Sequence, residues 1–131
     1  MVIKSLRAFG WLTGLLLIAL GISRMAFSLD SIPDGQTVNA TVDSESRAAG
    51  ALLIGFGVGY LEAFRRSVIP AGAVRLLAAT MALLGVSRLM SMVDVGMPHP
   101  AFTAACAVEF VAAGLTYWYA TLAERPDSGI R

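Results

Sequence analysis

The chain has few of the residues that build disulfides, metal sites and nucleic-acid surfaces. Its 131 residues include one cysteine and one histidine, and charged residues make up 15% with a net charge of +1. Cys106 has no second thiol to pair with and lies in an apolar run, so we expect a small buried side chain. His99 has no other ligand at a metal-binding spacing, so neither a metal site nor a cofactor is predicted. The small net charge and the lack of a Lys/Arg-rich stripe exclude a nucleic-acid surface.

Apolar residues are abundant instead. They account for 56% of the chain, and the mean hydropathy is +0.71, whereas soluble domains are about 45–50% apolar and about 25% charged. Four apolar runs are long enough to cross a bilayer, which takes about 17–25 helical residues. These runs cover residues 8–29, 46–64, 72–93 and 101–123. We therefore predict an all-α, polytopic membrane four-helix bundle that forms a single integral membrane domain over residues 1–131.

The sequence contains an internal repeat with an offset of 64 residues and no gap. The segment LGISR at 20–24 matches LGVSR at 84–88. Three further matches share this offset: Asp30 with Asp94, Glu45 with Glu109, and Ala48-Ala49-Gly50 with Ala112-Ala113-Gly114. The repeat predicts two helical hairpins, at about residues 8–66 and 72–125, related by a pseudo-twofold axis along the membrane normal.

The first apolar run also has features of a secretory signal peptide. Lys4 and Arg7 precede it, and small residues lie near its end at 26–28. Its counterpart in the repeat is an internal helix, which cannot be a signal peptide. We therefore expect the first run to be retained as a membrane helix.

Most basic residues are expected at one set of helix ends. Seven of the ten lie there: Lys4, Arg7, Arg65, Arg66, Arg75, Arg125 and Arg131. The other three, Arg24, Arg47 and Arg88, lie at the opposite ends beside acidic residues. Because Lys and Arg are enriched in cytoplasmic loops, we expect both termini to be cytoplasmic, in a multi-pass protein of the cytoplasmic (inner) membrane.

Each predicted helix has one face on which small and charged residues recur at helical spacing. The expected inner faces are Gly10, Gly14, Leu17, Gly21, Arg24 and Ser28; Glu45, Ala48, Leu52, Gly55, Gly59 and Glu62; Val74, Ala78, Met81, Gly85, Arg88 and Met92; and Ala105, Glu109, Ala112, Thr116 and Tyr119. Small residues let helices approach closely in lipid. The charged residues share these faces, so we expect them to point into the bundle.

Six polar residues form the candidate ligand-binding site. They are Arg24, Glu45, Arg47, Arg88, Asp94 and Glu109. A charge at the centre of a membrane helix costs about 2.5–3.5 kcal/mol on insertion scales, so the charges are expected to form ion pairs. We expect Arg24 to pair with Glu45. Arg88 is expected to pair with Glu109, unless the two hairpins exchange partners.

Two interpretations of these residues stay open. In the first, the ion pairs are structural and fix the register of the helices. In the second, the residues line an outward-opening polar pocket. Arg47 favours the second, because Val111 occupies the equivalent position and one half therefore carries an additional positive charge suited to an anion.

Catalytic chemistry finds little support in the sequence. The serines have no general base in a recognisable pattern, and no catalytic residue is assigned. The segment GFGVG at 55–59 superficially resembles a nucleotide-binding loop, but it lies in the middle of a predicted helix without a preceding strand. A non-enzymatic protein is therefore expected.

Two segments, SESRAAG at 44–50 and GVSRLMSMVD at 85–94, resemble those of a bacterial family of small four-span membrane proteins known only as a domain of unknown function. The family pattern has an acidic residue and an arginine at the start of helix two, and an arginine in a helix three that ends in Asp-Gly. The matching positions here are Glu45, Arg47, Arg88 and Asp94, with Val95 inserted before Gly96 as a departure. The composition looks actinobacterial, and the architecture is similar to that of the DoxX-like group. The resemblance implies a fold and a membrane location, and no activity.

Two functions are carried forward from the sequence. The first is an accessory or assembly subunit of a larger membrane complex, in contact with the lipid bilayer and with other membrane proteins or a second copy of itself. The alternative is a binder or carrier of a small lipid, a quinone or an amphipathic anion in an outward-facing intramembrane pocket. A transporter would require a dimer, since four helices leave little room for alternating access.

Overall fold

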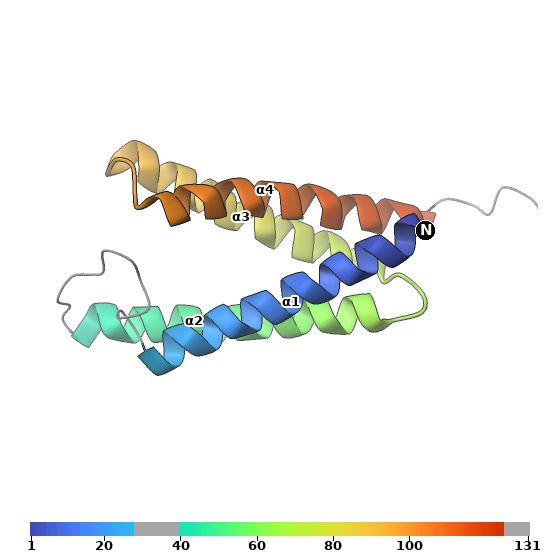
Figure 1. The fold of residues 1–131 in the computed structure, drawn as a ribbon, viewed down its shortest axis with the longest axis horizontal. Helices are drawn as coiled ribbons and strands as arrows, with labels where there is room; N and C mark the ends of the chain where they lie inside the picture. Colours follow the sequence, from blue (N-terminus) through green and yellow to red (C-terminus); the bar gives the residue numbers. More distant parts are fainter. Residues whose placement is uncertain (28–39, 125–131) are drawn as a thin grey trace, which may run out of the picture.

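The structure is a computed structural model that describes residues 1–27 and 40–124 (Figure 1). Its elements are α1 (Val2–Phe27), α2 (Ala40–Arg65), α3 (Ala71–Asp94), α4 (Pro100–Thr121) and the short 3-10 helix η2 (Leu122–Glu124). All four α-helices are long and apolar enough to cross a membrane, which confirms the predicted polytopic all-α fold. Helices α1 and α2 begin before the predicted apolar runs because polar residues, such as Lys4 and Asp43, belong to their first turns.

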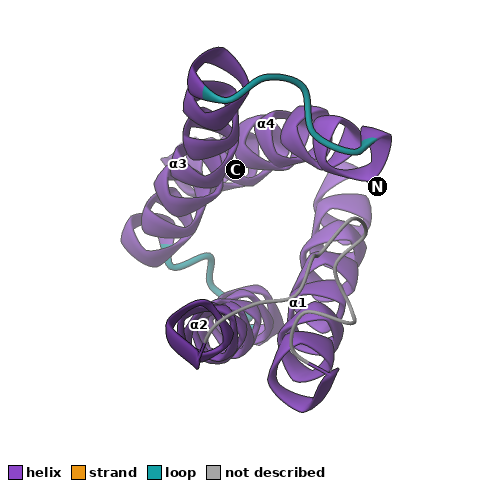
Figure 2. Cartoon of the chain, turned by 90° about the vertical axis from the view of Figure 1, so that its left-hand side faces the viewer, coloured by secondary structure: helices purple, strands orange, loops and turns teal. Residues whose placement is uncertain are grey.

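The helices pair as two hairpins, α1 with α2 (hairpin one) and α3 with α4 (hairpin two). Contact within each hairpin is extensive, whereas α1 with α4 and α2 with α3 touch little. Figure 1 shows the hairpins close together near the N-terminus and diverging toward the opposite end. We call these the joined end and the open end. Figure 2, viewed from the open end, shows the helices around a ring in the order α1, α2, α3, α4.

The hydrophobic core lies in the joined half of the molecule. Its buried members are Leu6, Leu17, Tyr60, Ala63, Phe64, Val74, Leu77, Met81, Ala112, Ala113, Tyr119 and Ala120. Aromatic rings connect the two hairpins within it: Phe64 stacks on Tyr119 with 4.4 Å between ring centroids, and Tyr60 stacks on Phe64 at 5.7 Å. Such pairs add about 0.5–1.5 kcal/mol each beyond the area they bury.

Arg7 adds polar connections at the same end. Its Nε donates to the hydroxyl of Tyr119 at 3.0 Å, which links α1 to α4. Its Nη2 donates to the carbonyl oxygens of Arg66 at 2.9 Å and Ser67 at 2.6 Å, in the connection between α2 and α3. One guanidinium therefore contacts three parts of the chain, and the joined end is fixed by both packing and hydrogen bonds.

Two glycine pairs hold hairpin one together. A Cβ placed on Gly14 would lie 2.8 Å from the carbonyl oxygen of Gly57, and one on Gly57 would lie 2.5 Å from that of Gly14. Gly21 and Gly50 have the same reciprocal relationship, at 2.5 Å and 2.8 Å. No side chain fits at these positions, so the two backbones are in direct contact, as small residues allow in membrane helices.

These glycine contacts overturn the predicted inner face of α2. Glu45, Ala48 and Gly55 are exposed, and Leu52 is 76% exposed. The buried positions of α2 are instead Ser46, Gly50, Gly57, Tyr60, Ala63 and Phe64. Placing Gly50 and Gly57 against α1 turns the opposite side of α2 away from the bundle. The predicted faces of α1 and α3 are confirmed through Gly21 and Gly85, both of which are buried.

The connection at the open end of hairpin two ends α3 and starts α4. Gly96 has a φ of 110°, a conformation that glycine adopts without a steric penalty. The Nδ1 atom of His99 accepts a hydrogen bond from the backbone N–H of Ala101 at 3.2 Å and so caps α4. Pro100 occupies the first turn of α4, where its missing N–H removes no helical hydrogen bond.

Candidate functional site

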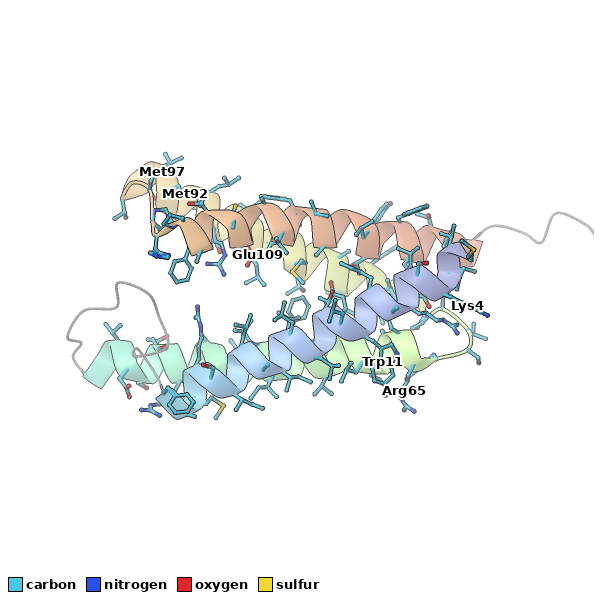
Figure 3. The ribbon with its side chains drawn as sticks, viewed as in Figure 1. Lys4, Trp11, Arg65, Met92, Met97 and Glu109 are labelled. Atoms are coloured by element: carbon cyan, nitrogen blue, oxygen red, sulfur yellow. The ribbon has the colours of Figure 1, made fainter. Side chains whose placement is uncertain are left out.

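Arg88 and Glu109 are brought together on the facing sides of α3 and α4. The Nε atom of Arg88 lies 2.8 Å from Oε1 and 2.9 Å from Oε2 of Glu109. The two side chains are 27% and 12% exposed, respectively. Figure 3 shows Glu109 on the side of hairpin two that is turned toward hairpin one. The contact therefore joins α3 to α4 and borders the space between the hairpins.

Only the Nε edge of Arg88 is used in this contact. A guanidinium carries five N–H donors, and among the described residues no acceptor bonds either Nη atom of Arg88. Its guanidinium carbon lies 5.7 Å from the ring centroid of Phe102, within cation–π range. The four N–H groups of the two Nη atoms therefore have no acceptor among the described residues.

A cavity of about 290 Å³ lies beside Arg88. It is lined by Ser87, Arg88, Ser91, Met92, Pro98 and Phe102. The lining combines one cationic group and two hydroxyl-bearing residues with apolar walls. Such a mixture suits a ligand that has both a charged and an apolar part.

Arg24 approaches the same region from hairpin one. It is half-buried, one turn before the end of α1. Among the described residues, no acidic side chain pairs with Arg24 and no hydrogen-bond acceptor is assigned to its guanidinium. Each hairpin therefore contributes one half-buried guanidinium toward the open end, and the carboxylate of Glu109 bonds that of Arg88.

The expected pair of Arg24 and Glu45 is not formed. Glu45 is exposed on α2, because the glycine contacts turn this side of the helix away from the bundle. Asp94 is exposed at the end of α3, and its repeat counterpart, Asp30, lies outside the described residues.

Arg47 also differs from its expected role. It is exposed, and its Nε lies 2.9 Å from Oδ2 of Asp43 on the same helix. Its Nη1 donates to the carbonyl oxygen of Met25 at 2.5 Å. A carboxylate therefore balances its charge, and its side chain ties the start of α2 to the end of α1.

The sequence interpretation missed the cavity-lining residues Ser87, Ser91 and Phe102. A signal for each was present. Ser87 and Ser91 are four residues apart and flank Arg88 on one helix surface, and Phe102 precedes Glu109 by seven residues, which is two helical turns. The predicted site contains charged residues only, and it therefore leaves out Ser87 although this serine lies in the repeated segment LGVSR at 84–88.

A second hollow, of about 470 Å³, lies at the joined end around the connection between α2 and α3. Its lining consists of Glu62, Arg65, Arg66, Ser67, Val68 and Pro70. Arg65 bonds the carboxylate of Glu62, and Arg66 lies 3.0 Å from it, so this acid is already occupied. In the part of the chain that the structure describes, no group of three or more His, Cys, Asp or Glu residues could hold a metal ion.

Comparison with known proteins gives one match. Residues 5–120 match the family model described as a domain of unknown function (DUF4345), and the matched range runs through all four helices. No curated protein and no solved structure matches the chain. The match agrees with the resemblance to a family of unknown function, and it attaches no ligand or partner to the residues described above.

Proposed function

The chain belongs to the DUF4345 family, and we propose that this member binds an amphipathic anion between its two hairpins, at the open end. One observation carries the proposal. Arg24 of hairpin one and Arg88 of hairpin two are both half-buried toward the open end, and among the described residues a single carboxylate, that of Glu109, is paired with them. A small membrane protein with this arrangement is suited to holding or carrying a lipid-like anion.

The hydrogen-bonding capacity of the two guanidinium groups supports an anionic ligand. Arg24 offers five donors and Arg88 four, with no acceptor assigned to them among the described residues. Leaving a charged group without partners in a bilayer is costly. A phosphate or a carboxylate matches the planar guanidinium fork with two oxygens. A ligand of this kind would satisfy donors on both hairpins at once.

The surroundings support a ligand with an apolar part. Met92, Pro98 and Phe102 form apolar walls beside Arg88. The hairpins diverge here (Figure 1), and neither α1 with α4 nor α2 with α3 is closely packed. Hydrocarbon chains would leave sideways between these helices into the bilayer. This geometry favours an amphipathic anion over a water-soluble one.

The distribution of basic residues supports a position in the outer half of the membrane. Figure 3 shows Lys4 and Arg65 at the joined end, and Met92 and Met97 at the open end. Cytoplasmic ends of membrane helices are enriched in Lys and Arg, so the joined end is proposed to be cytoplasmic. The ligand would then be held in the leaflet that faces away from the cytoplasm.

Native mass spectrometry of the protein, extracted gently from its membrane, tests the proposal. We expect a discrete adduct of lipid mass on the wild-type protein and its loss in Arg24→Gln. Arg66→Gln is the matched control, because it removes an equally charged arginine that is 57% exposed at the joined end and should leave the adduct in place. An adduct that survives Arg24→Gln, or none on the wild type, contradicts the proposal.

An accessory or assembly subunit is the second candidate function. The observation that favours it is that the hairpins pack together at the joined end and diverge toward the open end, which leaves interior helix surface for another chain to cover. The same measurement separates the two candidates. A second polypeptide of fixed stoichiometry, retained without any lipid, supports the accessory function.

A further inference from the structure

We infer that Glu109 sets the charge of the headgroup, so that the site takes an anion with one negative charge. This inference rests on the proposed function and narrows its ligand class. The chemistry is that of a phosphodiester or a carboxylate attached to an apolar chain. A phosphomonoester, which carries close to two charges above its second pKa of about 6, is disfavoured.

The charged groups that face the interior have a net charge of +1. Among the described residues at the open end, three half-buried charged groups are not paired with an exposed residue. They are Arg24, Arg88 and Glu109. They sum to one positive charge. Glu45 and Asp94 are exposed, and Arg47 is paired with Asp43. In a medium of low dielectric constant, a site with one positive charge binds most favourably a ligand with one negative charge, because the complex then has no net charge.

The position of Glu109 makes it the selective element. Its carboxylate accepts from Nε of Arg88, so a headgroup that enters the cavity lined by Arg88 would bond the Nη groups. A singly charged headgroup on that edge completes the coordination of Arg88. A second negative charge would be held close to Glu109 with no further cation to balance it, since Arg24 is already used.

Glu109 is also too deep to escape toward water. It lies nine residues after the first residue of α4, or about 13 Å along the helix at about 1.5 Å per residue. Its side chain is 12% exposed. A short carboxylate at this depth cannot reach the interface, so its charge acts on whatever Arg88 binds.

The test is a competition between lipids that differ only in headgroup charge. Dioleoyl phosphatidylglycerol carries one negative charge, and dioleoyl phosphatidic acid carries close to two at pH 8. Both are added in equal amounts to the full-length protein in detergent, and the ratio of the two adducts is read by native mass spectrometry. We expect phosphatidylglycerol to predominate on the wild type. In Glu109→Gln, which raises the interior charge to two, the ratio should shift toward phosphatidic acid by about tenfold or more.

A matched control keeps the charge of the residue. Glu109→Asp retains the carboxylate and should keep the wild-type preference for phosphatidylglycerol. An unchanged ratio in Glu109→Gln, with binding that still depends on Arg24, overturns the inference and leaves the proposed function standing. If Arg24→Gln, with Glu109 unchanged, binds lipid as well as the wild type does, the proposed function itself is overturned. A parallel binding measurement with oleate shows whether the site prefers a carboxylate headgroup or a phosphodiester headgroup.

A second variant keeps the inference testable if Glu109→Gln does not fold. Ser91 is exposed, and no side-chain hydrogen bond is assigned to it among the described residues. Ser91→Asp adds one negative charge beside the cavity and brings the balance to zero, so phosphatidylglycerol binding should fall about tenfold. Ser91→Asn introduces a side chain of nearly the same size as that aspartate but without a charge, so it should bind phosphatidylglycerol clearly better than Ser91→Asp does. Equal binding by the two variants would refute the charge argument.

Discussion

The hydroxyl oxygens of Tyr60 and Thr116 lie 3.0 Å apart, in the fully buried interior of the joined end. Tyr60 belongs to hairpin one and Thr116 to hairpin two. This hydrogen bond therefore crosses the bundle and sets one hairpin against the other. Without it, each buried hydroxyl would lose a partner in surroundings that offer little water.

Removing one member of this pair should destabilise the protein. Tyr60→Phe leaves the hydroxyl of Thr116 without its partner, and we expect a loss of about 1–3 kcal/mol. The measurement is thermal unfolding in detergent, followed by circular dichroism. The double variant Tyr60→Phe/Thr116→Val removes both polar groups, so it should lose less than the two single variants combined. Strictly additive losses would show that the bond makes no contribution of its own.

The glycine contacts of hairpin one predict a position-specific steric effect. Gly57→Val would place a Cβ 2.5 Å from the carbonyl oxygen of Gly14, and separation of α1 from α2 should lower stability by about 1–3 kcal/mol. Gly114→Ala is the matched control, because a Cβ there meets no other described heavy atom within 4 Å. It should be neutral or stabilising by up to about 1 kcal/mol, since alanine favours a helix more than glycine does. The unfolding temperature in detergent measures both.

Replacing only Glu109 should destabilise the protein more than replacing both Arg88 and Glu109. Glu109→Leu leaves a half-buried guanidinium without its carboxylate, and we expect a loss of about 2 kcal/mol, below the 3–5 kcal/mol of fully buried pairs. Adding Arg88→Met removes the unpaired charge and should recover most of the loss. Denaturation of the wild type and the two variants in detergent decides the matter. If the double variant is less stable than Glu109→Leu, the side chain of Arg88 stabilises the fold mainly by packing.

Arg24→Gln should behave differently from Glu109→Leu. No described acidic residue pairs with Arg24, which is half-buried, so replacing it removes an uncompensated charge. We expect unchanged or slightly raised stability in lipid-free detergent, together with loss of the added stability that an anionic lipid gives the wild type. Unfolding temperatures with and without phosphatidylglycerol measure this. A large drop for the variant without lipid would instead indicate a structural role for Arg24.

The orientation can be tested by cysteine labelling. Met97 is 73% exposed at the open end, and Val68 is 79% exposed at the joined end. In a Cys106→Ala background, a membrane-impermeant maleimide applied to intact cells should modify Met97→Cys and spare Val68→Cys until the cells are opened. The reverse pattern would place the joined end outside. In the unaltered protein, Cys106, which is 5% exposed, should stay unmodified.

Sequence patterns predicted the helices well because hydropathy and length determine which segments enter a bilayer. They also predicted the inner faces of α1 and α3, where Gly14 and Gly85 recur at helical spacing. The face of α2 was wrong, because small residues cover more than one side of that helix and only the contact with α1 selects Gly50 and Gly57. The candidate site failed at Glu45 for the same reason. The relative arrangement of the two hairpins depends on contacts between residues far apart in the sequence, such as Phe64 on Tyr119. Local sequence patterns could not predict it.

The glycine contacts have a consequence for how the protein is made. They join α1 to α2 through residues that a ribosome supplies before any part of hairpin two exists. Hairpin one can therefore reach its final packing while the rest of the chain is still being synthesised. Hairpin two then docks through the side chains of Thr116 and Tyr119 in the second half of α4, so docking must wait until α4 has been synthesised.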